Sequence, residues 1–175
     1  MEYKIEKKPA MTLTGFKRHF SGSPAERGDQ ECDFYLNTRV NQYLLVGLAG
    51  DSETFYNVMT NFGDEGYDFY IAAKLSKKKT ENLAAFIGED AKRYENIPIP
   101  EQLYLICETE RCVYPTMVFE ELRRRMVSEL LPSMDYELSD APEICIHHWF
   151  TDDEDPKVRE TRYAELWLPI EKKKA

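Results

Sequence analysis

The sequence predicts an α+β fold in which a strand-helix-strand-strand unit occurs twice and all the strands form one antiparallel sheet. Alternating apolar segments flank longer segments with helical spacing, and the same order of segments occurs in both halves of the chain. Residues 8–16 resemble 99–107 at an offset of 91 residues, and residues 67–75 resemble 163–171 at an offset of 96. We therefore expect a single domain over 1–175, with pseudo-repeats at about 1–80 and 97–171 and a connector at about 81–96.

The first unit begins with the strand KPAMTLTGF and continues with loose helical spacing over 31–48. Two strand segments, 54–62 and 67–75, follow and are separated by the polar turn GDEG. In this arrangement both helices pack on one face of the sheet, and we expect the uncovered face to hold a ligand between the two halves.

The second unit repeats this order, starting from the strand at 99–107. Pro115 suits a first helical turn, the run 116–131 has near-helical apolar spacing, and Pro132 ends it. Strands are expected at 142–150 and 163–170. Arg123 to Arg125 fall mainly on the solvent side of this helix, where neighbouring glutamates favour a charged outer face over a site for an acidic partner.

Composition excludes several classes of function. With 42% apolar residues the chain is expected to form a packed core, and the net charge of −9 argues against nonspecific binding to nucleic acid. The N-terminal segment lacks the apolar run of a signal peptide, and no run is long enough to cross a membrane, so we expect a cytoplasmic protein.

The four cysteines have no CxxC spacing, and a cytoplasmic setting keeps them reduced. A zinc site formed by Cys107, Cys112, Cys145 and His147 would match no common spacing, so buried thiols are the favoured interpretation. The sequence contains no phosphate-binding loop, dinucleotide fingerprint or paired metal histidines, and we expect neither a metal nor a cofactor.

The final strand, YAELWLPI, places a carboxylate between two aromatic rings. Side chains alternate along a strand, so Glu165 shares a face with Tyr163 and Trp167, while Ala164 and Leu166 point to the core. A desolvated carboxylate attracts a ligand cation, and the flanking rings add cation-π attraction. Burial would also raise the pKa of Glu165 toward the range of a general base. The alternative is an edge strand on which Glu165 is solvated or paired with an arginine.

Other aromatic and polar residues are candidates for the same site. His147 and Trp149 lie on the strand expected to pair with the last one, and Tyr104 lies on the first strand of the second unit, either as a groove residue or as a core ring. Tyr67 and Phe69 take the places of Tyr163 and Glu165 in the first unit, which would give one apolar wall and one charged wall.

Taken in order, the segments KPAMTLTGF, IPIPEQLYLICE, SELLPSMDYELSDAPEI and RYAELWLPI resemble the GyrI-like effector-binding domain shared by AraC-type transcription regulators and gyrase-inhibitory proteins. The resemblance covers nearly the whole chain and implies a duplicated strand-helix-strand-strand fold. It also implies a groove for hydrophobic, often cationic, aromatic small molecules with a buried acid near its centre, which maps onto Glu165. The frequent tryptophan before the LPS motif is Leu130 in this chain, and no helix-turn-helix segment is present.

Three functions follow from the resemblance and stay open. The first is a free-standing bacterial protein that binds amphipathic aromatic or cationic compounds, in the manner of a multidrug-binding effector domain. The second is a hydrolase that opens cyclopropane-bearing DNA-alkylating compounds, with Glu165 activating water. The third is an inhibitor of a DNA-handling enzyme such as gyrase, acting through its acidic surface, which leaves room for a protein partner or a homodimer.

Overall fold

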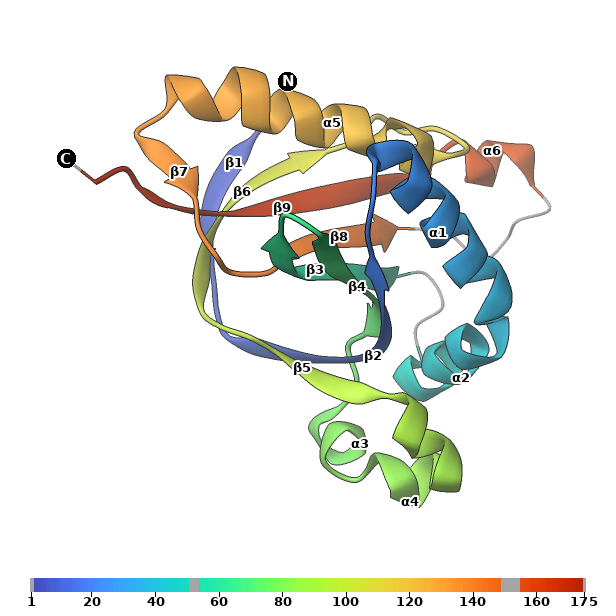
Figure 1. The fold of residues 1–175 in the computed structure, drawn as a ribbon. Coiled ribbons are helices and arrows are strands. Elements are labelled where there is room, and N and C mark those ends of the chain that lie inside the picture. The colour runs from blue at the N-terminus through green and yellow to red at the C-terminus, as the bar shows by residue number, and fades with distance from the viewer. Residues whose placement is uncertain (1, 51–53, 149–154, 175) are drawn as a thin grey trace.

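The computed structural model describes residues 2–50, 54–148 and 155–174. One antiparallel sheet curls into a half-barrel with helices along its outer side (Figure 1). Its strands follow the order β1-β6-β9-β8-β3-β4-β2-β5, and β7 pairs with β9 outside this order. The strands are β1 Lys4–Lys8, β2 Met11–Phe20, β3 Thr54–Gly63, β4 Gly66–Ala73, β5 Glu95–Ile99, β6 Gln102–Glu108, β7 Tyr136–Leu138, β8 Glu143–His148 and β9 Tyr163–Lys172. The predicted α+β class with an antiparallel sheet is confirmed.

The strand order has a twofold character. The order is unchanged when it is read from the opposite end and each strand is exchanged with its counterpart: β1 with β5, β2 with β6, β3 with β8 and β4 with β9. Around Pro9 the chain passes from β1 to β2, and around Pro100 from β5 to β6, so two bent strands pair with each other at both ends of the sheet. The central pair, β3 with β8, joins the two halves.

Helices α1 (Pro24–Asn37) and α2 (Arg39–Ala49) cover the first half. Helix α1 begins well before the expected residue 31, because Ser23 and Glu26 form a reciprocal capping box and Pro24 occupies the first turn. Gly50, with φ of 68°, ends α2 in the left-handed conformation that glycine adopts without strain.

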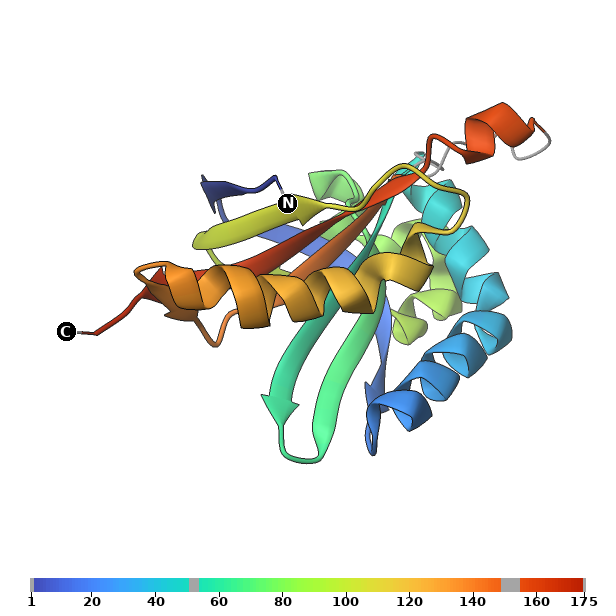
Figure 2. The ribbon, with the colours of Figure 1, turned by 90° about the horizontal axis from the view of Figure 1, so that it is seen from above.

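The helical segment of the second half lies where the sequence predicts it. A 3₁₀ turn (Pro115–Val118) leads into α5 (Phe119–Arg125), which continues through a π-helical turn (Met126–Leu130) to a 3₁₀ turn at Leu131–Ser133. Figure 2 shows α5 crossing the sheet, with α1 and α2 grouped on the side where α5 begins. The shorter helices are α3 (Lys77–Glu81), α4 (Leu83–Ile87) and α6 (Pro156–Arg159), with a 3₁₀ turn at Gly88–Arg93. No helix in the described ranges is long and apolar enough to span a membrane.

Both faces of the sheet are packed. Phe34 of α1 and Met126 next to α5 belong to clusters that fill the space between the helices and the outer face. The concave face has its own core, in which Leu13, Tyr104 and Ile144 are fully buried. The face away from the helices, where the sequence predicts a ligand, carries this second core, and ligand binding on it stays a prediction.

Candidate functional site

The residues proposed from the sequence divide between the two faces of the sheet. Glu165, Trp167, Tyr163 and Tyr104 lie on the concave side, as their cross-strand neighbours and packing partners show. The others that the structure describes lie on the helix side: Tyr67, Phe69 and His147. Trp149 lies outside the described residues.

Glu165 forms a compact polar group at one end of the concave face. Its side chain is 15% exposed, and it accepts hydrogen bonds from Trp167 Nε1 at 2.8 Å and His148 Nε2 at 3.0 Å. The imidazole of His148 stacks on Tyr163 with ring centroids 4.3 Å apart. Burial, followed by the charges of Glu108 and Glu165, raises the pKa of Tyr163.

Cations of the protein already cover the rings beside Glu165. The guanidinium of Arg111 lies 3.8 Å from the centroid of Tyr163, and Nζ of Lys8 lies 4.6 Å from the centroid of Trp167. A ligand cation stacking on these ring faces would have to displace Arg111 or Lys8.

Tyr104 is a core residue. It is fully buried, packs on Trp167 with ring centroids 5.6 Å apart, and donates its hydroxyl to the carbonyl of Pro142 at 3.1 Å. Burial raises its pKa to about 12. This packing agrees with the core ring, one of the two roles expected for Tyr104, and a contact of Tyr104 with a ligand stays a prediction.

Phe69 does not face Glu165. The strands β4 and β9 hold equivalent places in the two halves, but Phe69 packs under α1 on the outer face while Glu165 lies on the concave face. A shift of one residue along a strand moves every side chain to the other face. The opposite faces of Phe69 and Glu165 therefore show that the expected alignment of the two strands, at an offset of 96, is wrong by one residue.

A buried polar network occupies the helix side at the junction of the two halves. Asn57 of β3 is 3% exposed, and its carboxamide oxygen accepts from Tyr35 of α1 at 2.9 Å and lies 2.7 Å from His147 Nε2 of β8. The amide nitrogen of Asn57 donates to the backbone carbonyl of Tyr70 at 3.1 Å. His147 therefore directs Nε2–H at Asn57, and burial lowers its pKa to about 3, so the ring is neutral.

Glu31 lies one helical turn before Tyr35 on α1 and therefore on the same side of the helix. Burial, with a contribution from the like charge of Glu120 on α5, raises the pKa of Glu31 to about 7. Burial and then Glu31 also raise the pKa values of Tyr35 and Tyr67. Glu31 and both tyrosines nevertheless keep part of their surface open to water.

Arg123 connects α5 to the sheet on this same side. Its guanidinium makes two hydrogen bonds to Glu143 of β8, at 2.6 and 2.8 Å, and the Glu143 side chain is only 4% exposed. Arg123 also lies 6.0 Å from the ring centroid of Phe62, which packs on Tyr67. We call the surface formed by Glu31, Tyr35, Tyr67, Phe119 and Arg123 the interhelical face; Asn57, Cys145 and His147 lie beneath it.

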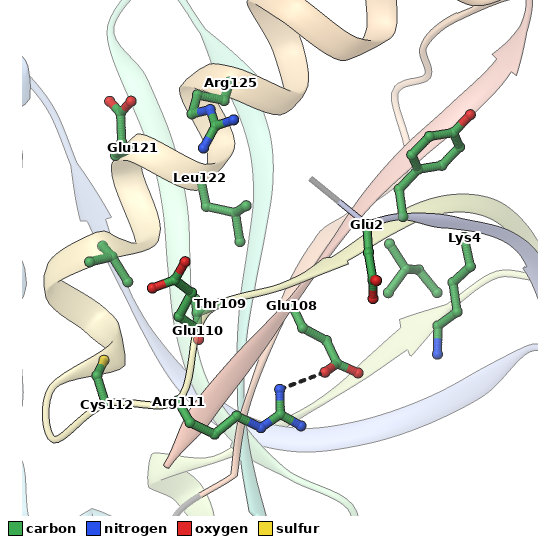
Figure 3. A pocket seen from close by; sticks show the side chains of 13 residues that line it. Glu2, Lys4, Glu108, Thr109, Glu110, Arg111, Cys112, Glu121, Leu122 and Arg125 are labelled. Atoms are coloured by element: carbon green, nitrogen blue, oxygen red, sulfur yellow. Dashed lines mark hydrogen bonds and ion pairs between the residues drawn. The ribbon is translucent and has the colours of Figure 1, made fainter. Parts of the chain in front are cut away.

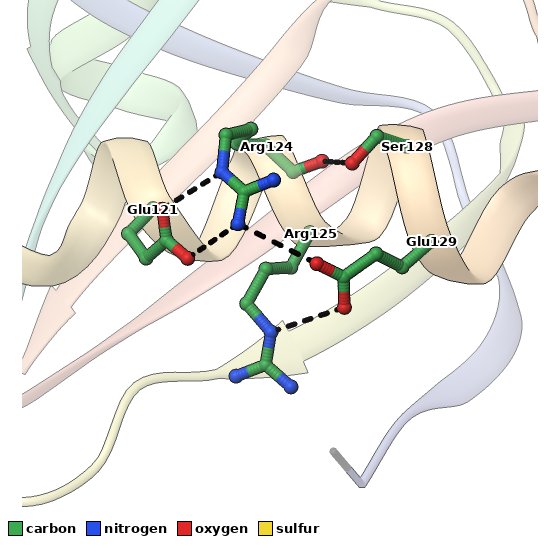
Figure 4. A network of polar contacts seen from close by, with 5 residues as sticks. All are labelled: Glu121, Arg124, Arg125, Ser128 and Glu129. Atoms are coloured by element: carbon green, nitrogen blue, oxygen red, sulfur yellow. Dashed lines mark hydrogen bonds and ion pairs between the residues drawn. The ribbon is translucent and has the colours of Figure 1, made fainter.

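The rest of the arginine triplet faces solvent with glutamate partners. Arg124 makes a bidentate pair with Glu121, and both Arg124 and Arg125 reach Glu129 at 3.4 Å (Figure 4). This geometry agrees with the charged outer helix face expected from the sequence.

A hollow of about 800 Å³ lies at the edge of the sheet, between the start of β1, the end of β6 and α5 (Figure 3). Its lining carries both signs of charge, including Glu2, Lys4 and Arg125, and Arg111 bonds Glu108 within it at 2.9 Å. Glu165 does not line it, although Glu108 is the cross-strand neighbour of Glu165. Mixed charges of this kind do not favour a lipophilic cation.

The cysteines show no metal-binding or catalytic arrangement. Cys107 and Cys145 are buried, and burial raises the pKa of both thiols. Cys145 Sγ lies 3.5 Å from His147 Nε2, but that nitrogen already faces Asn57, so His147 is not a base for the thiol. In the described part of the chain, no group of three or more histidine, cysteine, aspartate or glutamate side chains could hold a metal ion.

Sequence reasoning missed Glu31, Tyr35 and Asn57. The spacing of Glu31 and Tyr35 within one helical pattern was a usable signal, since residues four apart share a helix side. Nothing in the sequence around Asn57 distinguishes it from a surface strand residue, because its role depends on contacts with three distant segments.

Comparison with known proteins shows the fold. No family model and no curated protein matches the chain. Among solved structures, SAV2435 bound to tetraphenylphosphonium aligns with a TM-score of 0.68 and 17% identity, over 98% of this chain and 94% of the other. A bacterial transcription regulation protein of Staphylococcus aureus gives 0.66 and 16%, over 98% and 99%. The EcmrR C-terminal domain gives 0.58 and 9%, over 98% of each chain.

Proposed function

We propose that this protein binds a small aromatic cation on the interhelical face, with Glu31 as the counter-charge. The observation that carries the proposal is that Glu31 lies among aromatic side chains, partly open to water, with burial as the main cause of its raised pKa. Many protein atoms surround such a carboxyl while water still reaches it. A cation that replaces this water would relieve the cost of the buried charge.

The neighbouring side chains suit an aromatic cation. The rings of Tyr35, Tyr67 and Phe119 are partly exposed and come from α1, β4 and α5, so a ligand among them would touch both halves of the chain. Arg27 already lies 5.7 Å from the ring centroid of Tyr67, so a ligand gains cation-π attraction mainly from Tyr35 and Phe119, at about 0.5 to 2 kcal/mol for each ring depending on its desolvation. Because Glu120 already disfavours a second negative charge near Glu31, an added cation gains from both carboxylates.

The structural neighbours support the same class of function. SAV2435 was solved with tetraphenylphosphonium, a permanently charged aromatic cation, and other neighbours are a transcription regulation protein and a C-terminal domain of EcmrR. With the resemblance seen in the sequence, these support a GyrI-like effector-binding role for this chain.

Glu165 marks the alternative site that we consider for the ligand. A carboxylate that is 15% exposed and bonded to Trp167 and His148 has the character expected of a cation site or of a general base. Its disadvantage is that both carboxylate oxygens are engaged and that Arg111 and Lys8 cover the adjacent rings.

Calorimetric titration with tetraphenylphosphonium at about pH 8, above the pKa of Glu31, tests the proposal. We compare E31Q with E165Q, and D29N serves as a control that removes one exposed negative charge from the same helix. We expect E31Q to bind at least about tenfold more weakly than wild type, and E165Q and D29N to bind like wild type. Equal binding by wild type and E31Q would overturn the assignment to Glu31.

The hydrolase alternative is tested in a parallel incubation. A cyclopropane-bearing alkylating compound is recovered after incubation with wild type and with E165Q and is analysed by mass spectrometry. Recovery of the unchanged compound supports binding alone, whereas ring opening that disappears in E165Q would establish the enzyme.

A further inference from the structure

We infer that the preferred ligand carries its positive charge on nitrogen with an N–H donor, such as a protonated tertiary amine or an amidinium. The inference rests on the proposed function and names the chemical class that the interhelical face selects. It comes from the direction of the hydrogen bonds around Asn57.

The carboxamide of Asn57 has a fixed orientation. Its nitrogen lies 3.1 Å from the carbonyl oxygen of Tyr70, which can only accept, so the amide nitrogen must face that carbonyl. The carboxamide oxygen must then face Tyr35 and His147, at 2.9 and 2.7 Å. Reversal of the amide would set the carboxamide oxygen against the carbonyl oxygen of Tyr70.

This orientation fixes the direction of the hydroxyl proton of Tyr35. The proton points inward to Asn57, and this is the one hydrogen bond that the Tyr35 oxygen makes among the described residues. A phenolic oxygen accepts as well as donates, so Tyr35 keeps a lone pair but has no proton to offer a ligand. Tyr35 can therefore meet a ligand group only as an acceptor.

Glu31 also offers a ligand hydrogen-bond acceptors and no donor. Its ionised carboxylate accepts only, and it lies one turn from Tyr35 on the same side of α1. The two side chains present acceptors and no donor, in surroundings where burial raises the pKa of both. A cation with an N–H group can donate it to the Tyr35 oxygen while its charge lies near Glu31, whereas a quaternary ammonium or a phosphonium contributes charge alone.

A matched pair of probes tests the inference. The naphthylmethyl dimethylammonium ion carries one N–H, and its trimethylammonium counterpart replaces that proton with a methyl group. Both are titrated into wild type, Y35F and E31Q at about pH 8, with Y43F as a control because Tyr43 is a tyrosine of the neighbouring helix with 71% exposure. Y35F keeps the ring and leaves Asn57 with His147 as a donor, and its fold is checked by thermal unfolding.

We expect wild type and Y43F to bind the tertiary ion about tenfold more tightly than the quaternary ion, which is the effect of about one charge-assisted hydrogen bond. In Y35F this preference falls to about twofold or less, while affinity for the quaternary ion stays close to wild type. The inference is overturned if wild type binds the two ions equally, or if Y35F keeps the preference.

The variant E31Q separates the two proposals. If both ions bind, E31Q weakens both, and no preference exists, the N–H inference fails and the cation site stands. If neither ion binds, or if E31Q binds both like wild type, the proposed site fails together with the inference.

Discussion

The hydroxyl of Tyr35 on α1 donates to the carboxamide oxygen of Asn57 on β3 across 2.9 Å, and this bond ties the first helix to the centre of the sheet. Asn57 also bonds β4 through the carbonyl of Tyr70 and β8 through His147. One buried side chain therefore joins four elements from both halves of the chain, directly beneath the face that we propose for ligand binding.

Replacing Asn57 by alanine should destabilise the protein by about 2 kcal/mol, because the Tyr35 hydroxyl and the buried His147 ring lose their shared acceptor. Urea unfolding measures the change. Asn37 lies on the exposed side of α1, so N37A is the control for removal of an asparagine amide. Unfolding of N57A at the same urea concentration as wild type would contradict the role given to this network.

Glu31 should make stability depend on pH. The folded-state pKa of about 7 exceeds the ordinary value of 4.5, so the folded state binds the proton more tightly than the unfolded state. Its contribution is fully present below about pH 4.5 and is lost as pH rises through about 7. Between these two pH values, the free energy of unfolding of E31Q should rise relative to that of wild type by up to about 3 kcal/mol. Urea unfolding of both proteins at several pH values measures this difference, and parallel pH profiles would contradict the raised pKa.

The ion pair of Arg123 and Glu143 should stabilise the folded protein more than the neighbouring surface pair of Arg124 and Glu121. Removing Arg123 leaves the buried Glu143 carboxylate without its cation, so R123A should lower the free energy of unfolding by about 3 kcal/mol. R124A breaks the solvent-exposed pair with Glu121 and should change stability little. Chemical unfolding of the two variants makes the comparison, and equal effects would show that α5 is not held through Glu143.

His147 should stay neutral, with its proton on Nε2, across the range in which histidines usually titrate, because burial lowers its pKa to about 3. Nitrogen-15 NMR of the imidazole distinguishes the two tautomers and follows protonation. Titration of His147 with a midpoint above about pH 5, or a proton on Nδ1, would contradict the hydrogen-bond directions around Asn57.

The sequence predicted the strand and helix order because that order depends on local periodicity. Strand segments such as 54–62 and 163–170 correspond closely to β3 and β9, since alternation and the flanking polar turns mark them. The start of α1 was missed, although Ser23 and Glu26 were visible as a capping box.

The candidate site was harder to predict because it depends on which face each side chain occupies. Alternation correctly placed Glu165 with Trp167, but the likeness of two strands at an offset of 96 did not reveal the one-residue shift that puts Phe69 on the other face. Curling of the sheet could not be predicted from local patterns, and it is the curling that buries the concave face.

Amide NMR during titration with tetraphenylphosphonium tests the central claim most directly, because it locates the ligand without a mutation. Our account predicts that the largest shifts fall on Glu31, Tyr35, Asn57 and Tyr67, around the interhelical face. Large shifts confined to the strand around Glu165, with the α1 signals unmoved, would contradict it.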